Sequence, residues 1–268
     1  MFGRKRLCFF LALLLCWLAA FSSAALAEEE LHVEEAVILE DDGSETIDPD
    51  GVPSLTARED FINRIVALGE KLYLKANGKA QRAHYAGDIY VCKNFTVYLF
   101  RQNRDDFRMA EYPETTLVIP NNLPAKQCKP YAYGIFWEDV PAAKGNPFEV
   151  AAQFKYDSER SYEENYALAC DFMRQAQRGD FFQMSAEYDY GVGAHSAIML
   201  SYEADTDSIR WMDSNMRGKK VDGIRYGIVQ YDVEKPVEWW ASAFCKKKRG
   251  ATLYRLRDDI IYAEGREP

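Results

Sequence analysis

Hydrophobic residues recur at helical intervals in the segment 56–77. The run Thr56-Ala57-Arg58-Glu59 has the spacing of a capping box, in which the Thr56 and Glu59 side chains each bind a backbone N–H group. Asn77-Gly78 supplies residues that tolerate the left-handed conformation in which many helices end. The pattern predicts a first helix whose buried face carries Phe61, Ile62, Ile65, Val66, Leu68, Leu72 and Tyr73.

The next apolar segment, residues 91–100, fits two periodicities. Its β-branched residues permit a strand. Cys92, Phe95 and Leu99, however, recur at the spacing of one helix face. We therefore expect a second helix that begins near Cys92.

Residues 110–155 differ in kind from the segments before them. Six of the ten prolines of the chain lie between Pro113 and Pro147. Because proline removes a backbone donor and fixes φ, long regular elements are not expected here, apart from one short strand at 116–119. We interpret 110–155 as a long insertion of the kind that often shapes a binding groove.

The C-terminal part changes from a helical to a strand period. Ser161 and Glu164 form a second capping box, and the helix that follows is expected to end at Gly179. Alternating residues then predict antiparallel strands at 181–188, 194–202, 209–213 and 223–231, a short helix at 236–245 and a last strand at 252–256. Helices followed by an antiparallel meander indicate an α+β domain.

The N-terminus has the pattern of a secretory signal. Arg4, Lys5 and Arg6 precede an uncharged apolar run at 7–21, and Ala25-Leu26-Ala27 provides a small-residue cleavage site. We expect residues 1–27 to be removed, leaving a secreted or periplasmic (extracytoplasmic) protein without a stable membrane span. An uncleaved membrane anchor is the alternative.

The acidic charge of the chain is concentrated behind this signal. Residues 28–53 hold eleven of the 42 Asp and Glu residues and no Lys or Arg, which predicts a disordered acidic spacer. Residues 54–268 hold 30 basic and 31 acidic residues and are expected to form one domain. Because this body is nearly neutral, no nucleic-acid partner is predicted.

The reactive groups form a small set. The only histidines are His32, His84 and His195, and the chain has no His-Glu-x-x-His, Cys-x-x-Cys, Gly-x-Ser-x-Gly or phosphate-binding glycine motif. No metal or other cofactor is therefore predicted. A Cys/His pair remains as the candidate for chemistry.

Cys92 and His195 are the members of that pair. At a helix start the positive end of the dipole favours the thiolate of Cys92, although an inert buried cysteine fits the same apolar surroundings. His195 follows Gly191-Val192-Gly193-Ala194, and glycine such as Gly193 allows a substrate to approach the backbone closely. The alternative for His195 is a residue that caps a strand end.

A third member follows from the hairpin of 194–202 and 209–213. A turn centred near 204 places His195 opposite Asp213, and a turn centred near 205 places it opposite Asn215. Either side chain can accept the imidazole Nδ1–H and leave Nε2 facing the thiol. A turn-forming Asp-Ser-Asn sequence is the alternative.

These positions resemble the NlpC-type and CHAP-type cell-wall cysteine peptidases. The resemblance rests on Cys92 with Phe95, on Gly179-Asp180-Phe181-Phe182, on His195 and on Asp213-Ser214-Asn215. It implies a papain-like α+β fold with N-terminal helices packed on an antiparallel sheet, and hydrolysis of peptide or amide bonds in peptidoglycan. Cys92 would be the nucleophile, His195 the general base and Asp213 or Asn215 the orienting residue, with Tyr85 lining the site. The chain departs from the family's Asp-Cys-Ser-Gly-Phe, because it reads Val91-Cys92-Lys93-Asn94-Phe95.

Two other functions fit the same fold. A non-catalytic wall-binding or interaction domain could use a groove lined by Trp211, Trp239, Trp240, Tyr188 and Tyr190, although such aromatics also fill cores. An acyl- or aminotransferase would use the same Cys/His pair.

The remaining cysteines of the body are Cys128, Cys170 and Cys245. Secretion would permit one disulfide among them, and the sequence does not choose the pair. A disulfide that included Cys92 would exclude the enzyme.

Overall fold

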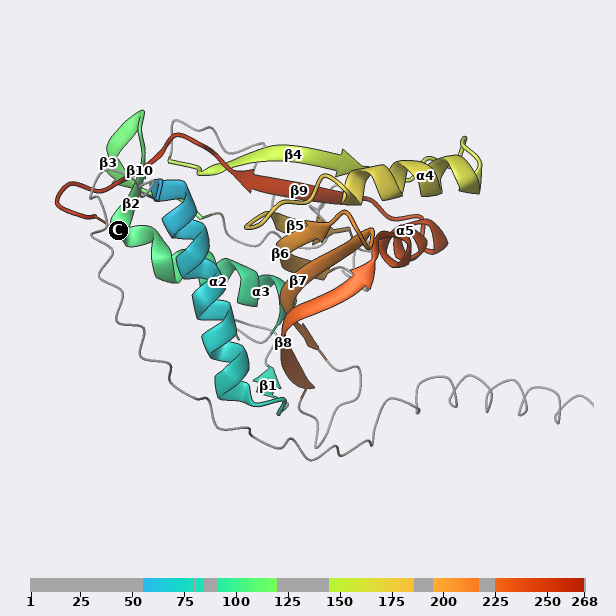
Figure 1. The fold of residues 1–268 in the computed structure, drawn as a ribbon, viewed down its shortest axis with the longest axis horizontal. Coiled ribbons are helices and arrows are strands. Elements are labelled where there is room, and N and C mark those ends of the chain that lie inside the picture. The colour runs from blue at the N-terminus through green and yellow to red at the C-terminus, as the bar shows by residue number, and fades with distance from the viewer. Residues whose placement is uncertain are drawn as a thin grey trace, which may run out of the picture. The chain divides into compact units, whose positions relative to one another are not determined.

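A seven-stranded antiparallel sheet lies at the centre of the computed structural model, which describes residues 55–79, 81–83, 91–119, 145–185, 195–216 and 225–267 (Figure 1). The strand order is β1-β8-β7-β6-β5-β9-β4, and a second sheet has the order β10-β2-β3. The strands of the large sheet are β1 (Gln81–Ala83), β4 (Phe148–Phe154), β5 (Phe181–Met184), β6 (His195–Glu203), β7 (Ser208–Met216), β8 (Arg225–Pro236) and β9 (Ala251–Leu256). The small sheet comprises β2 (Phe107–Met109), β3 (Tyr112–Thr116) and β10 (Ile260–Tyr262).

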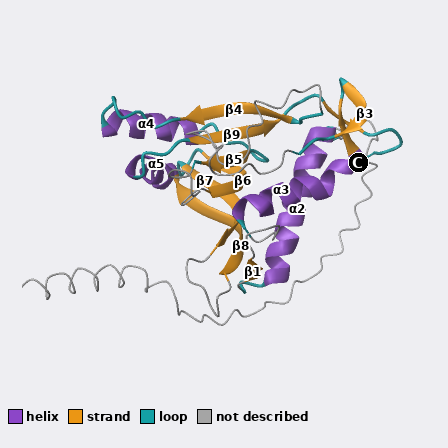
Figure 2. Cartoon of the chain, turned by 180° about the vertical axis from the view of Figure 1, so that it is seen from behind, coloured by secondary structure: helices purple, strands orange, loops and turns teal. Residues whose placement is uncertain are grey.

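Helices cover both faces of the large sheet. Helices α2 (Ala57–Ala76) and α3 (Cys92–Asn103) lie on one side, and α4 (Tyr162–Met173) and α5 (Val237–Lys246) lie on the other (Figures 1 and 2). Neighbouring residues of one strand enter different cores: Phe181 packs with α2 and α3, whereas Phe182 packs with α4 and α5. This is the period-two alternation of a sheet buried on both faces. The predicted α+β class, with N-terminal helices packed on an antiparallel sheet, is confirmed at this level.

Both predicted capping boxes are present. In α2 the Thr56 hydroxyl accepts the Glu59 N–H at 3.2 Å, and the Glu59 carboxylate accepts the Thr56 N–H at 2.9 Å. Ser161 and Glu164 make the same pair of bonds at the start of α4. Asn77 ends α2 in the left-handed conformation, with φ of 48°. These bonds satisfy backbone donors that a helix start otherwise leaves open.

The predicted meander is confirmed, because β5, β6, β7 and β8 pair in chain order. The helix after Ser161 is shorter than predicted, since α4 ends at Met173 and not at Gly179. The reason lies in the turn that replaces its last residues. After Met173 the backbone bonds span three residues, from the Gln175 N–H to the Phe172 carbonyl at 3.2 Å and from the Ala176 N–H to the Met173 carbonyl at 3.1 Å. The Asp180 carboxylate then accepts the Gln177 N–H at 2.9 Å.

The prediction that 110–155 lacks long regular elements was wrong at its C-terminal end. Strand β4 starts directly after Pro147 and pairs with β9 over its length. The short strand predicted at 116–119 was placed too far along the chain, because β3 spans Tyr112–Thr116 and residues 117–119 are not in a strand. Pro113 is tolerated in β3 because β3 is an edge strand. Residues 120–144 of the predicted insertion lie outside the described residues. No helix within the described ranges is long and apolar enough to cross a membrane.

Gly179→Ala is expected to destabilise the fold by about 2–4 kcal/mol. An alanine Cβ would sit in an unfavourable backbone conformation and 2.7 Å from Cγ1 of buried Ile62 on α2. Gly78→Ala is the matched control, because Gly78 also has a positive φ, +66°, but nothing within 4 Å of the added Cβ. Urea unfolding of the two variants should separate the effect of the backbone conformation, which both share, from that of the close contact with Ile62, which only Gly179→Ala has. Equal urea midpoints for the two variants would show that the contact with Ile62 is unimportant.

Candidate active site

Cys92 is the first residue of α3, as the sequence predicted. The preceding residue, Val91, is extended (φ −95°, ψ 133°) and provides no side-chain cap. A thiolate at the first residue of a helix lies at the positive end of the helix dipole. Buried Phe95, Leu99 and Phe100 hold α3 on the sheet and thereby fix the position of Cys92. Cys92 itself is partly exposed.

His195 and Asp213 come together from neighbouring strands. Nε2 of His195, the first residue of β6, lies 2.8 Å from Oδ2 of Asp213 on β7. The pairing of β6 with β7 joins Ile198 to Met212, and its continuation would place His195 opposite Asn215, so the imidazole reaches Asp213 diagonally. Asp213 is buried, whereas Asn215 is exposed. Of the two predicted orienting residues, the structure places only Asp213 on the imidazole.

The orientation of the imidazole differs from the prediction. We expected Nδ1 to face the orienting residue and Nε2 to face the thiol, but Nε2 faces Asp213. The structure therefore does not have the predicted arrangement, in which Nε2 faces the thiol. The diagonal placement of Asp213 explains the difference. Nε2 is the ring nitrogen farther from the β6 backbone, and it is therefore the nitrogen that reaches Asp213 on the neighbouring strand.

The electrostatics of the pair favour the charged forms. Burial of the imidazole opposes protonation, but the charge of Asp213, its hydrogen bond and the contact with Cys92 raise the pKa of His195 to about 10. Burial also opposes ionisation of Cys92. The hydrogen bond and charge of His195, with backbone N–H groups of Ser196 and Lys93, nevertheless hold the pKa of Cys92 below its ordinary value. The arrangement therefore favours a thiolate beside an imidazolium.

Trp211 was predicted to line a binding groove, but in the structure it is buried. It is 4% exposed, and its indole Nε1–H donates to Oδ2 of Asp213 at 2.9 Å. Trp240 is also buried, whereas Trp239 is 49% exposed. Sequence reasoning missed the role of Trp211 beside Asp213. The available signal was the spacing of two residues, which places two side chains on the same face of a strand.

Several predicted residues lie outside the described residues. These are Tyr85 and Gly193, which were predicted to contact substrate, together with Tyr188, Tyr190, His84 and Cys128. The predicted signal and acidic spacer also fall outside. Within the described part, Cys92, Cys170 and Cys245 are free thiols, so neither Cys170 nor Cys245 is in the disulfide considered from the sequence.

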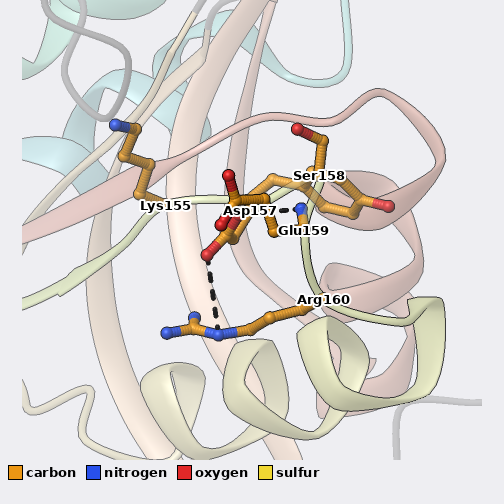
Figure 3. Close-up of a pocket in the computed structure, with 6 residues that line it drawn as sticks. Lys155, Asp157, Ser158, Glu159 and Arg160 are labelled. Atoms are coloured by element: carbon orange, nitrogen blue, oxygen red, sulfur yellow. Dashed lines mark hydrogen bonds and ion pairs between the residues drawn. The ribbon is translucent and has the colours of Figure 1, made fainter.

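A separate surface hollow of about 480 Å³ lies on the loop between β4 and α4 (Figure 3). Residues 155–160 line it, and none of them belongs to the Cys92 site. The Asp157 carboxylate accepts the Glu159 N–H at 2.9 Å and lies 3.7 Å from Nε of Arg160 (Figure 3). Among the described residues, no group of three or more His, Cys, Asp and Glu side chains is placed to hold a metal ion.

No protein-family model, curated protein or solved structure matches this chain. The likeness to NlpC-type and CHAP-type peptidases therefore stays a prediction from the sequence. Function has to be inferred from the geometry of Cys92, His195 and Asp213.

Proposed function

We propose that this protein is a secreted cysteine hydrolase of papain-like fold that cleaves peptide or amide bonds. One observation carries the proposal: a cysteine at a helix N-terminus is hydrogen-bonded to a histidine that a buried carboxylate holds in place. Nucleophile, base and orienting group in this order form the arrangement that activates a thiol for covalent catalysis.

The proposed reaction is acyl transfer to water. The Cys92 thiolate attacks the substrate carbonyl carbon, and backbone N–H groups at the start of α3, including that of Cys92, stabilise the oxyanion. The His195 imidazolium gives its proton to the leaving amine as the C–N bond breaks. His195 then removes a proton from water, which attacks the thioester and releases the carboxylic acid and the thiolate.

Peptidoglycan is the proposed substrate. The secretory signal pattern and the resemblance to cell-wall peptidases support this choice, and a peptide or amide bond is what the Cys/His chemistry would cleave. The nearly neutral body, with 30 basic and 31 acidic residues in 54–268, fits a peptide substrate better than a polyanion.

The test is release of soluble fragments from purified peptidoglycan by residues 28–268, followed by mass spectrometry. We expect new termini from the unaltered protein and none from Cys92→Ala. Equal release by Cys92→Ala would refute the hydrolase. Sedimentation of the protein with the wall, without any cleavage, would favour the binding domain instead, and new amide products in the presence of an added amine would favour the transferase.

The pH profiles of alkylation and hydrolysis are expected to differ. Alkylation needs only the thiolate, so its rate should fall on the acid side alone, at a pH below the ordinary thiol value of 9.0. Hydrolysis also needs the His195 proton, whose pKa is raised to about 10, so its rate should fall again as the pH rises through about 10. Initial rates of alkylation by iodoacetamide and of hydrolysis of wall fragments, measured from quenched samples over the same pH range, would show the difference. Loss of hydrolysis between pH 6 and 7 as the pH rises would contradict an imidazolium with a raised pKa.

A further inference from the structure

Asp213 is a buried carboxylate with an uneven set of partners. Its Oδ2 atom lies 2.8 Å from Nε2 of His195 and 2.9 Å from Nε1 of Trp211. Its Oδ1 atom is buried without a hydrogen-bond partner among the described residues. Both donors thus converge on one oxygen, which is the oxygen that orients the imidazole.

The Trp211 indole limits the rotation of this carboxylate. A carboxylate held by a single donor such as His195 can still turn about its Cβ–Cγ bond. A second donor in a fixed position restricts that rotation and sets the plane of the group. It also replaces hydration that burial has removed from the charge.

Trp211 is itself held by neighbouring rings. Trp239 stacks on it with ring centroids 6.0 Å apart and an interplanar angle of 19°, and Trp240 meets it edge-on at 4.8 Å and 72°. Both neighbours belong to the first turn of α5. The indole N–H is therefore fixed by packing between a strand and a helix before it donates to Asp213.

We infer that Trp211 is a positioning residue of the proposed active site: its indole N–H fixes Asp213, which in turn holds His195 against Cys92. This inference rests on the proposed function. Among the described residues, the charges with the largest effects on the thiolate and the imidazolium are those of Cys92, His195 and Asp213, so the effect of Trp211 is transmitted through Asp213.

Trp211→Phe tests the inference, with Trp240→Phe as the matched control. Both changes remove a buried indole N–H from the same aromatic group, but Nε1 of Trp240 has no hydrogen-bond partner among the described residues. In Trp211→Phe the midpoint of the pH profile of Cys92 alkylation should move about one pH unit upward, and the alkylation rate at a pH below both midpoints should fall about tenfold, the fold-change for one charge-assisted hydrogen bond. Trp240→Phe keeps an aromatic ring edge-on against Trp211, so it should leave the midpoint unchanged. A loss of packing alone would lower the unfolding temperature of both variants without moving either midpoint, and that result would overturn the inference.

A second measurement covers the case in which Trp211→Phe does not fold. The indole N–H resonance of Trp211 should differ between the unaltered protein and Asp213→Asn, while that of Trp240 should be the same in both. An unchanged Trp211 resonance would overturn the inference. Because this readout needs no turnover, it separates failure of the positioning role from failure of the proposed hydrolase, which would appear as an unreactive Cys92 in the unaltered protein.

Discussion

His195→Ala is expected to lower the rate of hydrolysis by a factor of about 10² to 10⁴. The change removes the group whose hydrogen bond and charge lower the pKa of Cys92, and it also removes the proton that the leaving amine needs. Without that hydrogen bond and charge, burial would raise the pKa of the Cys92 thiol, so only a small fraction would be ionised at neutral pH. The rate of fragment release from peptidoglycan, corrected for the folded fraction, measures the effect.

Asn215→Ala is the matched control for His195→Ala. Asn215 lies on β7 two residues after Asp213 and pairs with Ile228, but it is exposed. Its removal should leave the rate unchanged. If Asn215→Ala abolished hydrolysis while His195→Ala retained it, the placement of the imidazole on Asp213 would not describe the working site.

Asp180→Ala is expected to destabilise the domain by about 3–5 kcal/mol. Asp180 is 1% exposed and accepts two hydrogen bonds from Arg255, at 2.9 and 2.8 Å, and one from the Gln177 N–H. Removal of the carboxylate would leave the partly buried guanidinium without its counter-charge and the turn before β5 without its acceptor. Burial raises the pKa of Asp180 against the effect of Arg255, which reflects how far this carboxylate is from water. Thermal unfolding should show a midpoint about 10 °C lower.

An exposed ion pair provides the comparison for Asp180. Asp207 also binds an arginine through two hydrogen bonds, at 3.0 and 2.7 Å from Arg174, but both side chains are about 40% exposed. Asp207 also accepts a hydrogen bond from the Tyr202 hydroxyl and has a φ of 45°, so Asp207→Ala should cost about 1–2 kcal/mol. If Asp180→Ala lowered the free energy of unfolding by no more than Asp207→Ala, the Asp180–Arg255 pair would not be a stabilising buried contact between the turn before β5 and strand β9.

The elements that were predicted from the sequence are those defined by local signals. The capping boxes at Thr56 and Ser161 fixed the starts of α2 and α4, and period-two alternation located β5 to β9. Strands β1, β2 and β10 were missed because each has only three residues, too few to show a period. Their existence depends on partners far away in the chain, as in the pairing of Ile260 with Met109.

For the site, the sequence predicted which residues come together but not the contacts between their side chains. Helix periodicity placed Cys92 at a helix start, and hairpin geometry reduced the third member to Asp213 or Asn215. The choice between these two depended on a diagonal contact and on burial, which register alone does not reveal. The same limit applies to the orientation of the imidazole and to Trp211, whose bond to Asp213 needs the side-chain positions.

The central claim is that Cys92 is an activated thiol, and the most direct test compares the alkylation rates of the cysteines in the unaltered protein. Cys170 and Cys245 are internal references, since both are buried and burial raises their pKa values, that of Cys245 to about 11. With iodoacetamide near pH 7 and mass spectrometry to locate the label, we predict rapid modification of Cys92 and little of Cys170 or Cys245. A Cys92 that is no faster than an ordinary exposed thiol, or that is found in a disulfide, would contradict the account.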